Sequence, residues 1–197
     1  MVDDYETLWL DGSDQISQAA GVTARSMRDS PNSIAVSSDP FVRLEMLYKT
    51  FGEILGDARV AGVRRGTCVL GAAAAVQPGH CIDSMLPEEV RTLDEPPSNA
   101  TDGERFLYSG SLMAVHDLAE THWHVGPVGV EPGFQGMGLG RAAMRLLCNE
   151  LDDHRRVAWL ETDKPENVRF YSGLGFEVVE EVPMLTSRFW FMRREAA

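Results

Sequence analysis

Residues 135–140 read Gln-Gly-Met-Gly-Leu-Gly and lie between a strand-like segment and a helical one. Glycines at such a junction let the backbone adopt left-handed conformations and let a ligand approach bare N–H groups without meeting a Cβ atom. The first N–H groups of the following helix, and the positive end of its dipole, would face the same ligand. The pattern favours a phosphate or pyrophosphate site, and the alternative is a glycine turn with a structural purpose only.

Two other nucleotide-binding patterns do not match this glycine loop. A dinucleotide fingerprint requires Gly-x-Gly-x-x-Gly near the start of a strand-helix-strand unit, whereas the third glycine here comes one position early. No Lys-Ser or Lys-Thr follows the glycines, which excludes a Walker-type nucleotide loop.

The segments around the loop predict a mixed α/β fold in one domain, residues 1–197. Residues 122–130 and 157–162 read as strands. Between them Leu139, Ala143, Leu147 and Leu151 recur every four positions, as on one helix face, which predicts a helix that ends at His154. This strand-helix-strand order predicts a parallel pair with a right-handed crossover. The other predicted helices are residues 40–55, 103–119 and 165–173, and the other predicted strands are residues 59–63, 68–76, 176–182 and 185–192.

Local signals delimit some of these elements better than others. Asp39 is a predicted N-cap before Pro40, Asp163 and Glu166 resemble a capping box, and Pro183 separates the last two strands. No motif anchors residues 1–38, where a helix-like patch at 14–20 ends at a glycine; a mobile arm, an edge strand at 5–10 and a lid are the alternatives. Residues 77–102 predict a long loop with at most a turn or two of helix.

The composition limits the compartment and the class of partner. Eighteen Lys and Arg residues against thirty Asp and Glu give a net charge of −12, which argues against a nucleic-acid or anionic-membrane surface and favours cationic substrates. Three cysteines without disulfide or zinc spacing fit a reducing compartment. The acidic start of the chain is not a signal peptide, and no apolar run is long enough to span a bilayer. We therefore expect a cytoplasmic protein without nucleic-acid or membrane partners.

Three features in chain order resemble the GNAT superfamily of acyl-CoA-dependent N-acetyltransferases. They are a strand ending in Val130-Glu131-Pro132, the glycine loop, and Asn167-Val168-Arg169-Phe170-Tyr171 leading to Gly173-Leu174-Gly175-Phe176. The loop is similar to that family's Gln/Arg-x-x-Gly-x-Gly/Ala signature, and the clear resemblance covers residues 122–191. It implies a mostly antiparallel central sheet of six or seven strands with one splayed parallel pair, flanked by helices, and acetyl-CoA as the acyl donor.

The resemblance also implies how acetyl-CoA is bound. Backbone amides of the glycine loop hold its pyrophosphate, its pantetheine arm lies between the two splayed strands, and N–H groups of residues 128–130 stabilise the oxyanion. Arg141 either adds a cation to the phosphates or is an ordinary surface arginine. The implied cofactor-binding residues are Val128, Gly129, Val130, Gln135, Gly136, Met137, Gly138, Leu139, Gly140, Arg141, Asn167 and Tyr171.

Acyl transfer to an amine needs a neutral amine, a stabilised oxyanion and a proton for the departing thiolate. The resemblance assigns the proton donor to Tyr171, one helical turn after Asn167. His124 is a candidate base because an imidazole titrates in the useful range. Glu161 and Glu131, near the ends of the two parallel strands, are further candidates, and an ordered water chain stays open.

The sequence thus predicts transfer of acetyl from acetyl-CoA to a primary amine by direct attack in a ternary complex. The alternative is a non-catalytic acyl-CoA-binding or regulatory domain. We expect a small-molecule acceptor rather than a protein, contacted by residues 39–55, 77–102 and 183–187, and a homodimer stays open. We expect no metal, because His80, His116 and His154 show no ligand spacing with each other or with the cysteines.

Overall fold

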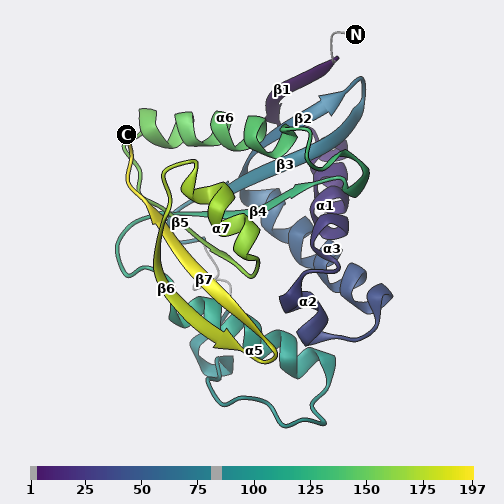
Figure 1. Cartoon of the computed structure of the whole chain (residues 1–197), viewed down its shortest axis with the longest axis vertical. Coiled ribbons are helices and arrows are strands. Elements are labelled where there is room, and N and C mark those ends of the chain that lie inside the picture. Colours follow the sequence, from purple (N-terminus) through teal and green to yellow (C-terminus); the bar gives the residue numbers. More distant parts are fainter. Residues whose placement is uncertain (1–3, 81–85) are drawn as a thin grey trace.

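The computed structural model describes residues 4–80 and 86–197, and one seven-stranded sheet runs through it (Figure 1). The order across the sheet is β1-β2-β3-β4-β5-β7-β6, and only β4 and β5 pair in parallel. The mixed α/β fold with one parallel pair, predicted from the sequence, is confirmed. The strands are β1 (Tyr5–Leu10), β2 (Arg59–Arg65), β3 (Cys68–Val76), β4 (Trp123–Val130), β5 (Ala158–Thr162), β6 (Glu177–Met184) and β7 (Ser187–Arg194).

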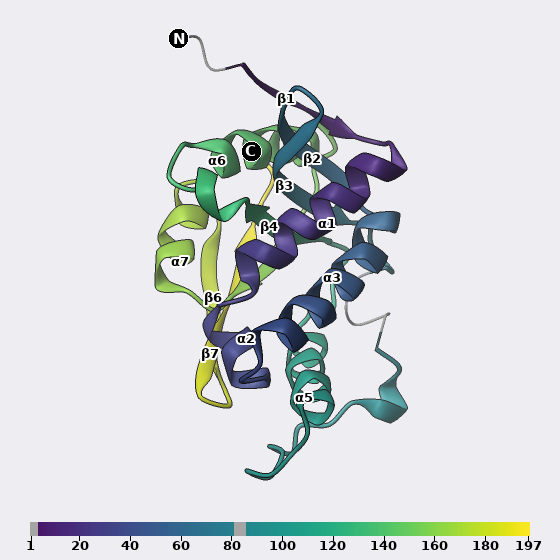
Figure 2. The ribbon, with the colours of Figure 1, turned by 90° about the vertical axis from the view of Figure 1, so that its right-hand side faces the viewer.

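Helices cover both faces of this sheet (Figure 2). One face carries α6 (Leu139–Asp153) and α7 (Pro165–Ser172). Two short 3-10 turns, Glu88–Val90 and Pro132–Phe134, lie in the connections between elements. The opposite face carries α1 (Ser13–Met27), α2 (Pro31–Val36), α3 (Pro40–Asp57) and α5 (Asp102–Val115).

Strand β3 shows how two helical layers share one strand. Ala73 and Ala75 pack in the cluster beneath α6, whereas Ala72 and Ala74 pack in the cluster beneath α1. Alanine has high helical propensity, but these alanines are fully buried between the two layers, and burial of both faces outweighs propensity. The predicted strand at residues 68–76 is confirmed to the residue.

The N-terminal segment is more ordered than its sequence indicated. Residues 5–10 form edge strand β1, one of the three alternatives, and the helix predicted over residues 14–20 continues through Gly21 to Met27. An internal glycine costs a helix about 1 kcal/mol. Burial of Ala19, Ala20, Val22 and Ala24 offsets that cost, so the predicted end at Gly21 was wrong.

Other predicted caps and boundaries also differ from the structure. The proposed capping box is absent, because the Asp163 carboxylate accepts the Asn32 N–H at 2.7 Å and Lys164 is the N-cap of α7. Pro183 lies inside β6, an edge strand that tolerates a missing N–H. Helix α5 ends at Val115, four residues early. Part of the predicted 77–102 loop, residues 81–85, lies outside the described residues.

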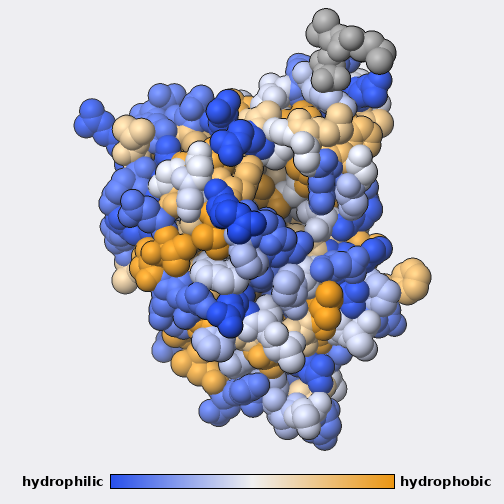
Figure 3. All heavy atoms as spheres, viewed as in Figure 1, coloured by the Kyte–Doolittle hydropathy of each residue, from blue (hydrophilic) through white to orange (hydrophobic). Residues whose placement is uncertain are grey.

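The outer edge of the sheet is partly apolar. Val178 and Val179 of β6 are exposed. The space-filling view shows a hydrophobic patch on its left side, in the region where Figure 1 draws β6 (Figure 3). None of the helices in the described part of the chain combines the length and the apolar composition that a bilayer crossing requires. The expected cytoplasmic location and homodimer stay predictions.

Candidate functional site

The two parallel strands separate soon after they pair. Their ladder contains Trp123 with Ala158 and His124 with Trp159, after which β4 continues to Val130 and β5 to Thr162. Alternate backbone groups of a strand point to opposite edges, so part of β4 beyond His124 directs N–H and C=O groups into the gap. An amide-bearing chain can pair with those groups as an additional strand would.

A β-bulge lies within the separated part of β4. Ala73 is opposite Val128 and Ala75 is opposite Val125, so three steps along β4 match two along β3 and the extra residue falls at Gly126-Pro127. The bulge therefore precedes residues 128–130, to which the resemblance assigned the oxyanion donor. Bulges change the direction in which backbone groups point, so the N–H groups that follow Pro127 stay candidates for the oxyanion donor.

The glycine loop has the geometry that its sequence suggested. Gly136 and Gly138 have φ angles of 77° and 84°, and a Cβ atom built on either would meet nothing within 4 Å. Gly138 is the N-cap of α6 and has no side chain with which to cap the first N–H groups. At Gly140 a Cβ atom would lie 3.3 Å from Val130 Cγ2, so this glycine permits close packing of helix on strand. The first two glycines thus leave room for a ligand over a helix N-terminus.

The gap and the glycine loop open into one cavity of about 750 Å³. His124 and residues 125–130 of β4 line it, as do the loop, Glu161 at the end of β5, and α7. Asn167 and Tyr171 both reach it, as their spacing of four residues predicted. The Asn167 amide donates to Thr162 Oγ1 at 3.0 Å, which orients its side chain along the cavity wall.

Tyr171 is buried with only 6% of its surface exposed, and its ring contacts Phe170 and Phe176 edge to face. Burial raises the pKa of the Tyr171 hydroxyl above its ordinary value, and the Glu161 and Asp163 carboxylates raise it further. The hydroxyl therefore stays protonated at neutral pH and can act as a donor.

Two carboxylates and two histidines form a buried group beside Tyr171, which we term the carboxylate–imidazole network (Asp117, His122, His124 and Glu161). His124 Nε2 lies 2.9 Å from Glu161 Oε2 and its Nδ1 lies 3.4 Å from Asp117 Oδ1. His122 Nε2 lies 2.9 Å from the same Asp117 oxygen. The side chains of Asp117, His122 and His124 are at most 4% exposed, whereas that of Glu161 is 16% exposed and reaches the cavity.

The electrostatic setting of His124 differs from that of a free imidazole. Burial acts against its charge, but the Glu161 and Asp117 carboxylates outweigh burial and raise the pKa of His124 to about 10. The His124 ring is consequently positively charged at neutral pH, and one ring nitrogen faces each carboxylate. This setting suits a fixed cation better than the neutral base that the sequence suggested.

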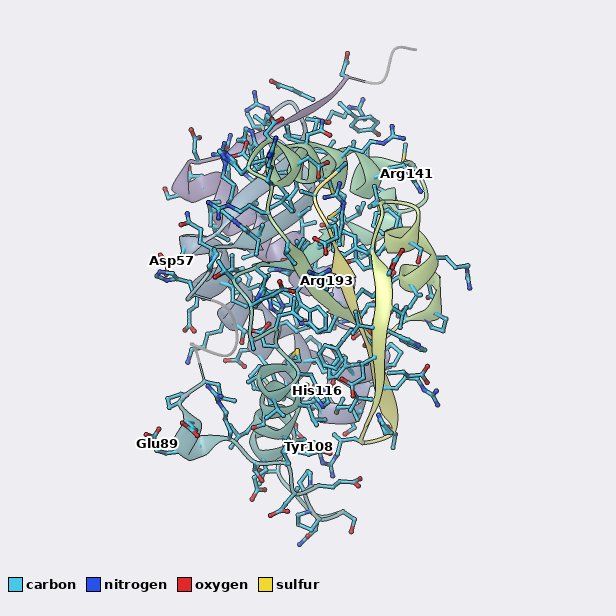
Figure 4. All side chains as sticks on the ribbon, turned by 90° about the vertical axis from the view of Figure 1, so that its left-hand side faces the viewer. Asp57, Glu89, Tyr108, His116, Arg141 and Arg193 are labelled. Atoms are coloured by element: carbon cyan, nitrogen blue, oxygen red, sulfur yellow. The ribbon has the colours of Figure 1, made fainter. Side chains whose placement is uncertain are left out.

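The two remaining candidates are Glu131, as a base, and Arg141, as a contact to phosphate. Glu131 is held by Arg25 of α1, whose Nη2 lies 2.7 Å and whose Nε lies 3.0 Å from Oε2, so its carboxylate ties β4 to α1 and is not directed at a substrate. Arg141 lies at the start of α6 above α7, with its guanidinium carbon 5.8 Å from the Phe170 ring centre (Figure 4). Arg141 also lines the cavity beside the glycine loop.

The rest of the cavity wall comes from elements that the sequence predicted only in part. Helix α3 contributes as expected, with Phe51, Glu53 and Ile54 among its lining residues. The loop after β3 contributes Leu86, and none of residues 183–187 lines the cavity. The first two helices and α5 contribute instead, for example through Met113. Helix α1 packs on β3 and β4, and α2 packs on α5 and β7.

Sequence reasoning missed Asp117 altogether. It lies in the connection between α5 and β4, where no periodic pattern marks the direction of a side chain. His122 directly precedes β4 and is two residues from His124, so the two lie on the same face of the strand, and both contact Asp117 Oδ1. Ligand atoms of Asp117, His122 and His124 lie within 4.8 Å of one another, an arrangement that could also hold a metal ion. The expectation that the protein holds no metal was based on His80, His116 and His154, and not on these three residues.

Comparison with known proteins connects these features to one family. A family model described as the acetyltransferase (GNAT) family matches residues 69–176. The matched segment runs from β3 to the residue before β6, so it contains the separated strands, the glycine loop and α7.

Solved structures with the same fold include several acetyltransferases. A polyamine N-acetyltransferase from Drosophila melanogaster, described as catalysing the formation of N-acetylagmatine, aligns at 14% identity over 98% of this chain and 100% of its own, with a TM-score of 0.68. A Corynebacterium glutamicum protein described as histone acetyltransferase HPA2 and related acetyltransferase aligns at 14% identity over 98% and 97%, with a TM-score of 0.67. The protein yncA from Salmonella typhimurium, solved with its cofactor acetyl-CoA, aligns at 16% identity over 99% and 95%, with a TM-score of 0.57. At these identities the likeness shows a shared fold.

Proposed function

This chain belongs to the acetyltransferase (GNAT) family, and from that premise we propose that it transfers the acetyl group of acetyl-CoA to a primary amine by direct attack in a ternary complex. One observation carries the proposal. The gap between β4 and β5, the glycine loop, the Tyr171 hydroxyl and the Glu161 carboxylate all meet in the same cavity. A donor site and the groups that move protons are thus adjacent.

Acetyl-CoA supplies the thioester, and the chain offers matching groups along its length. The glycine loop and the N-terminus of α6 present N–H groups to the pyrophosphate, with Arg141 beside them. The unpaired edge of β4 presents N–H and C=O groups to the pantetheine amides. Asn167, oriented by Thr162, lies where the arm passes α7. The fit depends on Gly136 and Gly138, whose open Cβ positions leave the loop accessible.

The protons have defined routes in this arrangement. When the amine nitrogen bonds to the acyl carbon and the C–S bond breaks, one proton leaves nitrogen and one is needed at sulfur. The Glu161 carboxylate, facing the cavity with His124 behind it, receives the first. The buried Tyr171 hydroxyl supplies the second, and backbone N–H groups after the β4 bulge stabilise the oxyanion.

We infer that the acceptor is a small cationic amine. The net charge is −12, and Glu53, Glu161 and Asp163 line the cavity together with apolar side chains such as Phe51 and Met113. Carboxylates attract an ammonium group, and apolar walls accommodate the methylene chain that carries it. Structural neighbours described as acting on agmatine and polyamines are consistent with this class.

Thiol release from acetyl-CoA with a panel of monoamines, diamines, polyamines and aminoglycosides tests the proposal. We expect release with at least one cationic amine, and a kcat lowered by about 100-fold or more in Glu161→Gln, since general base groups contribute about 10²- to 10⁴-fold. Glu180→Gln, on the outer strand β6, is the matched control and should retain activity. Acetyl-CoA binding without thiol release from any amine would instead indicate a non-catalytic acyl-CoA-binding domain.

A further inference from the structure

Three members of the carboxylate–imidazole network bring one nitrogen or oxygen atom each into a small buried volume. They are Asp117, His122 and His124, which we term the His–His–Asp cluster. His122 Nε2 lies 2.9 Å and His124 Nδ1 lies 3.4 Å from Asp117 Oδ1. One ligand atom from each of the three residues lies within 4.8 Å of those of the other two. All three side chains are at most 4% exposed, so they meet inside the protein and not on its surface.

The second nitrogen of each ring faces an oxygen acceptor outside the cluster. His122 Nδ1 lies 2.8 Å from the Glu120 carbonyl oxygen, which can only accept, so this nitrogen carries a proton. His124 Nε2 lies 2.9 Å from Glu161 Oε2. A histidine that binds a metal usually directs its other ring N–H at a backbone carbonyl or a carboxylate, which fixes the orientation of the ring. One partner of each kind is present here, and both leave the remaining nitrogen directed at Asp117.

The contacts inside the cluster match metal coordination better than hydrogen bonding. His124 Nδ1 is buried and makes no hydrogen bond within the described part of the chain, although Asp117 Oδ1 is 3.4 Å away. Ligand atoms about 2.0–2.1 Å from a tetrahedral zinc ion are about 3.3–3.4 Å from one another. The separation of Asp117 Oδ1 from His124 Nδ1 has this value, and its separation from His122 Nε2 is a few tenths of an ångström shorter.

We propose that the His–His–Asp cluster binds one zinc ion through Asp117 Oδ1, His122 Nε2 and His124 Nδ1. Two imidazole nitrogens and one carboxylate oxygen are a ligand set that zinc accepts, whereas magnesium and calcium prefer oxygen ligands alone. Three protein ligands leave the fourth position of a tetrahedral site to water. In the metal-free chain, protons occupy ring nitrogens that the ion would bind, so binding releases protons to the solvent.

The position of the cluster indicates what the ion does. Asp117 and His122 lie in the segment between the end of α5 at Val115 and the start of β4 at Trp123. An ion bound to them and to His124 ties this segment to the strand and fixes the His124 ring, which lines the cavity and faces Glu161. The ion therefore stabilises the cavity wall from inside the protein. This inference is independent of the proposed acetyl transfer.

The test titrates Zn²⁺ into the full chain after treatment with a chelator, by calorimetry and by thermal unfolding. We expect one equivalent to bind, and Zn²⁺ at about 100 times its dissociation constant to raise Tm by about 5–11 °C. His122→Gln should weaken the affinity by about 100-fold or more, because loss of an outer partner alone typically costs 10- to 100-fold. His116→Gln is the matched control, since His116 precedes Asp117 but its Nδ1 pairs with Glu180 and its ring stacks on Phe191 (Figure 4). Absence of saturable binding to the wild-type chain, or equal affinity in His122→Gln, overturns the proposal.

X-ray absorption at the zinc edge, measured on the zinc-loaded wild-type chain, provides a readout that does not depend on how well a variant folds. We expect nitrogen and oxygen ligands at about 2.0–2.1 Å, with the outer scattering of two imidazole rings. The exposed thiol of Cys68 is the competing ligand that must be excluded. A sulfur ligand at about 2.3 Å, or the scattering of fewer than two imidazole rings, places the ion elsewhere and overturns the proposal.

Discussion

Gly138→Ala isolates the contribution of the glycine loop to donor binding. Gly138 has a φ angle of 84°, and a left-handed conformation costs a residue with a Cβ atom about 1–2 kcal/mol. If the loop relaxes to relieve this strain, acetyl-CoA must restore the original conformation when it binds. A penalty of about 1–2 kcal/mol corresponds to a dissociation constant weakened about 5- to 30-fold. The new methyl group also enters space that borders the cavity, which acts in the same direction.

Two other glycines provide matched controls for this variant. Gly66, in the turn between β2 and β3, has a φ angle of 60° and open space around its Cβ position, but it is remote from the cavity. Gly133 precedes the loop, has open space and does not have a positive φ angle. We expect Gly66→Ala to lose about 1–2 kcal/mol of stability without a change in affinity, and Gly133→Ala to change neither by much.

Isothermal titration with CoA and acetyl-CoA measures the affinities directly, and ligand-dependent thermal unfolding checks them. At 100 times the dissociation constant, a ligand stabilises the folded state by about 2.7 kcal/mol, which for a chain of this size raises Tm by about 5–11 °C. In Gly138→Ala the shift at the same ligand concentration should be smaller. A dissociation constant within twofold of wild type would refute the assignment of the loop as the pyrophosphate site.

Three further predictions follow from individual side chains. Tyr171→Phe should lower kcat by about 100-fold or more while Tm changes little, because the ring contacts with Phe170 and Phe176 remain; normal thiol release would remove Tyr171 from the proton-donor role. Since the pKa of His124 is raised from 6.5 to about 10, its contribution to stability is complete below pH 6.5 and is lost as pH rises through 10; urea unfolding across this range should show a decline that His124→Gln lacks. Arg194→Met should destabilise the fold by about 2–3 kcal/mol, because Arg194 is 8% exposed and donates to both Asp152 oxygens at 2.7 Å; the exposed Arg188 on β7, mutated to Met, should cost under about 0.5 kcal/mol in the same thermal unfolding assay.

Local sequence determined the elements whose ends and faces depend on neighbouring residues. Asp39 accepts the Phe41 N–H at 2.8 Å and begins α3 as predicted. Gly136 and Gly138 adopt the left-handed conformations that alternate glycines suggested, and Asn167 and Tyr171 share one side of α7 because helix geometry places residues four apart on one face. In each case the physical cause acts over a few residues, so the pattern was readable in the chain.

Tertiary structure decided which of several equivalent polar groups reach the site. The Asp163 carboxylate, predicted as a cap, binds Asn32 of α2, and Glu131, a predicted candidate base, binds Arg25 of α1. Asp117 joined the site although nothing near it in sequence marked it. These outcomes depend on partners 106 to 131 residues away along the chain, or on the direction of a connecting segment, neither of which a local pattern specifies.

The protonation of His124 shows what the sequence and the tertiary structure each determined. Its residue type and position on β4 followed from the sequence, and a free imidazole titrates near neutral pH. Only the fold places Glu161 and Asp117 on either side of its ring, which converts a candidate base into an imidazolium. The sequence by itself therefore determined the glycine loop and the positions of Asn167, Tyr171 and His124 on their elements. The tertiary structure decided their charges, because charge depends on which groups burial brings together.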